Sequence, residues 1–118
     1  MLAACGDRDA LSSTAGLDPH QQELHRAFAI CAGCHDTRPE LGNRFGPNLH
    51  GVVGRKAGTA PGYHYSDAMK ASGIIWDAQT LDAFLKSPTQ KVPGTRMVNA
   101  TADPARRKAV IEYLSQQK

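Results

Sequence analysis

Apolar residues recur at helical spacing in the segment that begins at Asp18. Asp18 followed by Pro19 is an N-cap signal with proline at the first helical position. Apolar side chains then return every three or four residues, at Leu24, Ala27, Phe28 and Cys31. This pattern predicts a first helix whose last turns carry Cys31 and Cys34.

Two shorter helices are expected in the middle of the chain. The segment from Tyr65 to Ser72 precedes Gly73, a residue that commonly ends helices. Asp77 is a second N-cap signal, and the helix after it ends before Pro88. Its apolar residues are Leu81, Phe84 and Leu85.

A final helix opens at Asp103–Pro104, which repeats the signal of the first helix. Its apolar face carries Val110, Ile111 and Leu114, and Tyr113 adjoins that face. Between the first helix and the middle ones, residues 36–64 are rich in glycine and proline, which predicts irregular loops. Strand-like alternation, repeats and transmembrane runs are absent from the sequence, so we expect an all-α fold with long loops.

Composition and charge describe a small domain that needs additional apolar material at its centre. With 118 residues and 6% aromatic content, the chain can bury only a modest core of its own. Its net charge of +3 is too slight to indicate nucleic-acid binding. Basic side chains can still steer acidic partners, although an ordinary solvated surface explains them equally well: Lys56, Lys86, Lys91 and Arg96.

The motif Cys31-Ala32-Gly33-Cys34-His35 has the spacing that attaches a c-type haem. Two cysteines at this spacing can form thioethers with the two vinyl groups of one porphyrin edge, and the adjacent imidazole can bind the iron. A zinc site or a redox-active dithiol also uses Cys-x-x-Cys. Zinc would need a second ligand pair, which the sequence lacks, and a thioredoxin-like dithiol would need a preceding β-strand. One covalently bound haem c is therefore the predicted cofactor.

Met97 is the candidate for the sixth iron position. It ends the turn segment Pro93-Gly94-Thr95-Arg96-Met97, and its soft thioether suits haem iron. Met69 falls in a predicted helix and is expected in the core. Iron closed by His35 and Met97 predicts a one-electron carrier rather than an enzyme; the alternative is a haem peroxidase or small-ligand-binding haem protein in which Met97 is displaced.

Residues 1–17 differ in character from the domain expected at 18–118. Leu2-Ala3-Ala4-Cys5 resembles a lipoprotein cleavage site, in which Cys5 becomes the lipidated N-terminus. A polar stretch from Gly6 to Gly16 follows and would act as a flexible tether. A frayed N-terminus with an incidental cysteine is the other interpretation.

From about Leu24 to Leu114 the chain resembles a class I cytochrome c of the mitochondrial and photosynthetic-bacterial type. The matching stretches occur in the family's order: Cys31–His35, Gly46–Gly51, Gly54–Lys56, Tyr65–Ala68, Gly73–Trp76, Pro93–Met97 and Ile111–Leu114. The resemblance implies a cytochrome c fold, with helices around one covalently attached haem.

The same resemblance implies roles for single residues. Cys31 and Cys34 would form the thioethers, and His35 and Met97 would be the axial ligands. The carbonyl of Pro47 would accept from the other nitrogen of His35 and orient its ring. The remaining site residues would donate to the haem propionates or to a nearby water: Arg55, Tyr65, Trp76 and Thr95.

The resemblance also implies a cellular setting. We expect a periplasmic, monomeric electron carrier that takes electrons from a cytochrome bc1-type donor and passes them to a terminal oxidase or reductase. Cys5 would add a lipid tether to the membrane.

Three positions depart from the family pattern. Phe84 replaces a tyrosine that usually donates to the methionine sulfur, and Met69 replaces an asparagine that commonly holds a buried water. Both changes predict a drier pocket on the methionine side of the iron. Asn99 replaces an aromatic residue that usually covers the haem edge, so we expect that edge to be more open.

Overall fold

The first described helix, α2, begins and ends close to its predicted limits. A computed structural model describes residues 16–118, so Cys5 and most of the predicted tether lie outside the described residues. Helix α2 spans Pro19–Phe28, and the carboxylate of Asp18 caps it by accepting from the N–H of Gln21 at 2.8 Å. The predicted N-cap is therefore confirmed.

The prediction that the cysteines lie on the last turns of this helix is wrong. Cys31 opens a separate 3₁₀ turn, η1, which spans Cys31–Gly33, and Cys34 is the C-cap of this turn. After Phe28 the backbone hydrogen bonds join residues three positions apart instead of four. The N–H of Ala29 donates to the carbonyl of Arg26, and the N–H of Ala32 donates to the carbonyl of Ala29. A 3₁₀ turn has a different pitch from an α-helix. No glycine or proline between residues 29 and 32 marks this change in the sequence, so packing decides it.

The two middle helices follow the prediction with one addition. Helix α3 spans Asp67–Ala71 and is capped by Ser66, slightly inside the predicted range. Helix α4 spans Ala78–Lys86 and starts in a capping box between Asp77 and Thr80. A further short helix, α5, spans Pro88–Lys91 and was not predicted; Pro88, which limits α4, also opens α5 at its first position.

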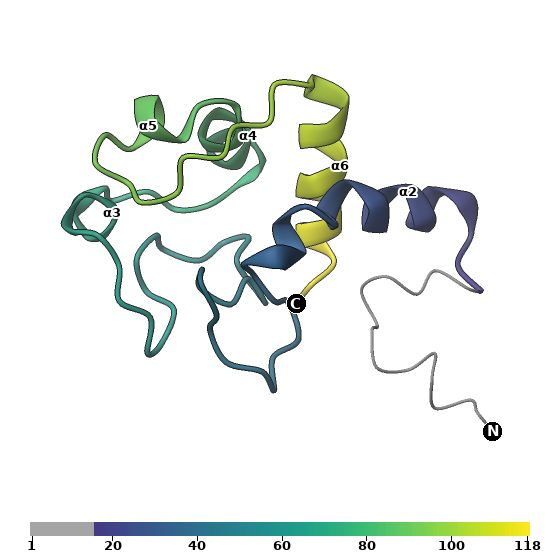
Figure 1. Cartoon of the computed structure of the whole chain (residues 1–118), viewed down its shortest axis with the longest axis horizontal. Coiled ribbons are helices and arrows are strands. Elements are labelled where there is room, and N and C mark those ends of the chain that lie inside the picture. Colours follow the sequence, from purple (N-terminus) through teal and green to yellow (C-terminus); the bar gives the residue numbers. More distant parts are fainter. Residues whose placement is uncertain (1–15) are drawn as a thin grey trace.

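The last helix, α6, spans Pro104–Ser115 and is capped by Asp103, as predicted. Figure 1 shows α2 crossing α6 near one end of the molecule, with α4 and α5 on the other side of α6. The loops of residues 36–66 run below these helices in the view of Figure 1. Within residues 16–118 extended pairing is limited to one isolated bridge, between Lys56 and Ile75, which confirms the all-α class.

The crossing of α2 and α6 forms the closely packed part of the core. The rings of Phe28 and Tyr113 stack with their centroids 4.6 Å apart. Leu24 and Val110 lie in the same cluster, with exposures of 1% and 2%. Burial of each such side chain contributes about 1.5–3 kcal/mol. This packing fixes the segment that leads into Cys31. None of the helices in residues 16–118 has both the length and the apolar character needed to cross a membrane.

An ion pair at the surface adds a pH-dependent contact between the same two helices. Nε2 of His20, at the start of α2, lies 2.6 Å from Oε2 of Glu112 in α6. The hydrogen bond and charge of Glu112 raise the pKa of His20 above its ordinary value of 6.5. The contribution of this pair to stability is therefore fully present below that ordinary pKa and is lost as the pH rises through the raised pKa.

We predict that Glu112→Gln lowers the stability of the holoprotein more at about pH 5.5 than at about pH 9, because only the protonated imidazole pairs with the carboxylate. Urea unfolding followed by circular dichroism at both pH values measures the difference. An equal loss at the two pH values would show that the pair does not contribute as an ion pair.

Candidate functional site

His35 is oriented by a backbone carbonyl. Its Nδ1 lies 2.8 Å from the carbonyl oxygen of Pro47, to which the ring N–H donates. Burial lowers the pKa of His35 below 6.5, against the opposing effect of the Pro47 carbonyl. The imidazole is therefore neutral at neutral pH, with its proton on Nδ1 and a lone pair on Nε2. A ring in this tautomer is prepared to bind a metal through Nε2.

Gly46 is required for this arrangement because the His35 ring lies against its Cα. A Cβ atom at position 46 would lie 2.3 Å from Cε1 and 2.8 Å from Nε2 of His35. Such a contact is impossible without movement of the ring or of the loop. The glycine therefore permits the close approach that the bond from His35 to Pro47 needs.

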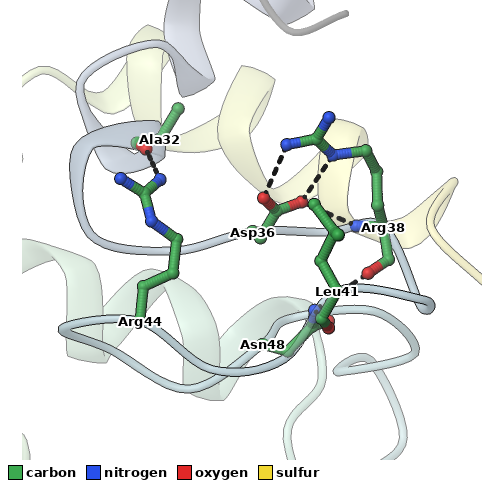
Figure 2. A network of polar contacts seen from close by, with 6 residues as sticks. All are labelled: Ala32, Asp36, Arg38, Leu41, Arg44 and Asn48. Carbon is green, nitrogen blue, oxygen red and sulfur yellow. Dashed lines mark hydrogen bonds and ion pairs between the residues drawn. The ribbon is translucent and has the colours of Figure 1, made fainter.

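A polar network holds the loop that presents Gly46 and Pro47 to His35 (Figure 2). Asp36 is buried, with an exposure of 2%, and accepts from Nε and Nη2 of Arg38 at 2.9 and 2.8 Å. The hydrogen bonds from Arg38 lower the pKa of Asp36 to about 2. The carboxylate stays charged, and its pairing offsets the cost of burying it.

The rest of this network ties the ends of the loop together. The side-chain amide of Asn48 donates to the carbonyls of Arg38 and Leu41, at 3.0 and 2.7 Å. Nη1 of Arg44 donates to the carbonyl of Ala32 in the η1 turn, at 2.8 Å (Figure 2). The backbone N–H of Gly46 also donates to Cys34 at 2.8 Å. These bonds place the loop directly against the Cys-x-x-Cys-His segment.

One cavity brings together all of the predicted site residues. Its volume is about 470 Å³, within the range of about 300–1,000 Å³ that is usual for cofactor sites. Apolar walls come from α2, α4 and α6 through Phe28, Leu81, Leu85 and Val110. The predicted site residues that line it are Cys31, Cys34, His35, Pro47, Arg55, Tyr65, Trp76, Thr95 and Met97.

Two polar side chains of the cavity wall, those of Arg55 and Tyr65, form hydrogen bonds within the protein and still have N–H or O–H groups that can donate to a ligand. Arg55 donates to the carbonyls of His50 and Asn48, at 3.1 and 3.0 Å, which uses part of its guanidinium and ties down the loop after Pro47. The hydroxyl oxygen of Tyr65 accepts the N–H of Ala60 at 3.0 Å, so its own hydrogen remains for a group in the cavity. Both residues therefore suit carboxylate groups of a ligand.

The turn before Met97 is built from glycine and threonine. Gly94 has a φ of 94°, and a Cβ there would lie 3.0 Å from the Cβ of Ala68 in α3. Oγ1 of Thr95 accepts the N–H of Met97 at 3.3 Å. The predicted role of Thr95 as a donor is thus joined by a second one, because its oxygen fixes the backbone of Met97.

The departures from the family pattern lie in the same cavity. Phe84 packs edge-on against Trp76, with the ring centroids 5.2 Å apart. Met69 and Asn99 also line the cavity. Phe84 and Met69 place apolar groups in the cavity wall, at positions where the family usually has a hydroxyl and an amide, and the drier pocket stays a prediction.

Neither alternative for the Cys-x-x-Cys pair gains support from the geometry. Within residues 16–118, no three His, Cys, Asp or Glu side chains gather in a group that could hold a metal ion. Burial raises the pKa of the Cys31 thiol, whereas a redox-active dithiol depends on a lowered one.

Sequence reasoning missed the residues that hold the loop. Asp36, Arg38, Asn43, Arg44 and Asn48 received no role. Asn43 bridges two loops, since its side chain accepts from the N–H of Asn48 and donates to the carbonyl of Pro61, at 2.8 and 2.9 Å. The one local signal was the Asp-x-Arg spacing directly after His35. Nδ1 of His50, a half-buried residue of this loop, lies 3.1 Å from the carbonyl oxygen of Thr37.

Comparison with known proteins decides the family. The family model for cytochrome c matches residues 25–118. This chain belongs to the cytochrome c family. It is 44% identical to a cytochrome c2 of Rhodomicrobium vannielii over 107 residues, which are 90% of this chain and 84% of that protein. It is also 45% identical to a cytochrome c2 of Rhodoblastus acidophilus over 77% of this chain and 86% of that protein.

Among solved structures, cytochrome cH from Methylobacterium extorquens matches with a TM-score of 0.74 and 45% identity, over 80% of this chain and 95% of that one. The cytochrome c fold is therefore confirmed, and so is the assignment as an electron carrier with one covalently attached haem.

The residues of this cavity fit a haem. The cavity has apolar walls, a neutral imidazole and a thioether, and it carries two cysteines beside that imidazole. Donors that remain on Arg55 and Tyr65 match the carboxylates of the porphyrin. No group in the lining contradicts the assignment.

We predict that Gly46→Ala displaces the His35 ring and breaks its bond to Pro47, because the new methyl group overlaps the imidazole. Overpacking of this kind costs about 1–3 kcal/mol. Thermal unfolding and the proton NMR signals of the His35 ring in the holoprotein would report both effects. Gly42→Ala is the matched control, since a Cβ there meets nothing within 4 Å. Equal behaviour of the two variants would contradict the proposed close approach.

Proposed function

We propose that this cytochrome carries single electrons on an iron held between His35 and Met97. The observation that carries the proposal is the cavity that both side chains line together with Cys31 and Cys34. When bound, the haem supplies a reversible change of one electron between Fe(III) and Fe(II). The residues of the chain hold the group, orient its ligands and exclude water.

His35 supplies its Nε2 lone pair, and the bond from Nδ1 to Pro47 keeps the ring in one orientation. Met97 supplies a soft thioether from a turn that Gly94 and Thr95 shape. Because the fold holds both side chains in place, His35 and Met97 would bind a haem iron in either oxidation state, and the chain would need little rearrangement when an electron is gained or lost. Cys31 and Cys34 hold the porphyrin edge by thioethers.

The propionates are proposed to lie against Arg55, Tyr65 and Trp76. Support comes from the spare donors of Arg55 and Tyr65 and from the place of Trp76 in the same wall. Thr95 joins this set, although its oxygen also fixes Met97. These donors neutralise part of the carboxylate charge and so influence the reduction potential.

The electron is proposed to pass through the porphyrin edge at the mouth of the cavity. Phe45 lines the cavity and is 83% exposed, which places it at the mouth. Arg96 also lines the cavity and supplies positive charge there. Positive charge at this place favours acidic partners, and a cytochrome bc1-type donor and a terminal oxidase or reductase acceptor are the proposed ones.

A periplasmic location with a lipid tether completes the proposal. In bacteria thioether attachment of haem is completed outside the cytoplasmic membrane, which favours the periplasm. The proposed domain starts at Asp18, where the N-cap of α2 lies, and residues 1–17 comprise the lipobox-like segment and the tether, with Cys5 as the acylated N-terminus of the mature chain.

We predict that Met97→Ala abolishes the sulfur-to-iron charge-transfer band and gives high-spin iron with raised peroxidase activity, because the sixth position opens. Absorption spectra of the matured holoprotein measure this change. Met69→Leu is the control, since it alters the other methionine of the cavity and should keep the band. An unmutated protein that is already high-spin, without the band, would refute the ligation and favour the peroxidase alternative.

We predict that the natural precursor, with its export signal, fractionates with membranes and that Cys5→Ser prevents this. Acylation with more than one chain anchors stably, whereas a hydroxyl at position 5 cannot be processed in the same way. Mass spectrometry of the mature N-terminus decides between the outcomes. An unmodified N-terminus that begins after Cys5 would mean a freely diffusing carrier.

A further inference from the structure

Arg107 is a buried cation ten residues after Met97 in the sequence, and sequence reasoning gave it no role. It lies in α6 with a side-chain exposure of 7%, and its Nε donates to Oδ1 of Asp82 in α4 at 2.8 Å. Its Nη1 donates to the carbonyls of Thr101 and Ala102, both at 2.9 Å. One guanidinium thus joins two helices and the segment between them.

The carbonyls that Arg107 binds belong to the segment that follows Met97 in the chain. The N–H of Thr101 donates to the carbonyl of Leu85 at 2.7 Å, and both residues line the haem cavity. Thr101 follows Met97 by four residues. Four residues span at most about 14 Å. An anchor at Thr101 therefore limits the positions that the sulfur of Met97 can reach.

The other side of Met97 is anchored independently. Arg96 donates to the carbonyls of His64 and Tyr65, and Thr95 donates its N–H to Val92 and accepts from Met97. These bonds fix the backbone before Met97. The remaining freedom of the Met97 side chain therefore depends on how firmly the segment after it is held at Thr101 and Ala102. Arg107 supplies the charged hydrogen bonds of that anchor.

We infer that Arg107 is a positioning residue for Met97, which acts with Asp82 as a clamp that keeps the thioether on the iron. The inference rests on the proposed Met97 ligation. Asp82 holds the guanidinium in place and balances its charge, and the guanidinium holds the carbonyls of Thr101 and Ala102. Loss of the clamp lets the segment move away from α4, and an added ligand then competes better with Met97.

The test is the affinity of the ferric holoprotein for imidazole, a ligand that binds only when Met97 leaves. Hydrogen bonds to charged groups contribute about 1.5–3 kcal/mol, so Arg107→Ala is expected to raise the affinity by about tenfold or more. Asp82→Ala is expected to raise it by a smaller factor, because the guanidinium keeps its bonds to the two carbonyls. Asp82 is about half-exposed, with 48% side-chain exposure, so this variant keeps the fold even if Arg107→Ala does not.

Leu24→Ala is the control for general destabilisation. Leu24 is a residue of α2 that is buried in the core and does not line the cavity. Its truncation lowers the free energy of unfolding but should leave the imidazole affinity unchanged, under conditions where all variants are folded. Denaturant unfolding of each variant gives the comparison.

Each other outcome overturns the inference. Unchanged imidazole affinity in Asp82→Ala and Arg107→Ala would show that the clamp does not position Met97, and an equal rise in Leu24→Ala would show that only global stability matters. In both cases, a sulfur-to-iron charge-transfer band in the spectrum of the unmutated protein would still support ligation by Met97. Absence of that band would refute the ligation and the clamp together.

Discussion

The bond between Nδ1 of His35 and the carbonyl of Pro47 is the constraint on which the site depends. It selects the tautomer that leaves a lone pair on Nε2 and fixes the plane of the ring. It is possible only because Gly46 has no side chain where the ring lies. The loop of residues 36–48, its polar network and its contact with η1 together hold the carbonyl of Pro47 next to Nδ1 of His35.

Two buried charges stabilise segments that lack regular structure. Asp36 pairs with Arg38 inside the loop that carries Pro47, and Arg107 pairs with Asp82 beside the segment that carries Met97. A buried charge is costly without partners, and each of these charges is satisfied by several hydrogen bonds. Their pairing restricts the loops on both sides of the cavity, where packing of helices alone would leave the backbone free.

A small chain with a large cavity depends on its cofactor for part of its stability. Apolar side chains that line the cavity include Ile30 and Phe45, which are 71% and 83% exposed, and a bound haem would cover part of this surface. Binding to the folded state alone favours that state. Covalent attachment of the haem makes this contribution permanent in a domain with few aromatic residues and long loops.

Local sequence signals predicted most of the helices and the haem attachment, and the family resemblance added the other predicted residues that line the cavity. Asp18, Asp77 and Asp103 lie where the caps were expected, because capping depends on residues only a few positions apart. The motif around His35 and the turn before Met97 are likewise local, so their chemistry could be inferred from spacing and family resemblance.

Tertiary structure decided what depends on contacts between distant segments. No local residue marks the change from α-helix to 3₁₀ turn before Cys31, and the loop contacts this turn through the bond from Arg44 to the carbonyl of Ala32. The contacts of His35 with Gly46 and of Arg107 with Asp82 also join separate segments of the backbone. A sequence specifies which groups are available to donate and accept, but the fold determines which of them meet, because hydrogen bonds act only at contact distance.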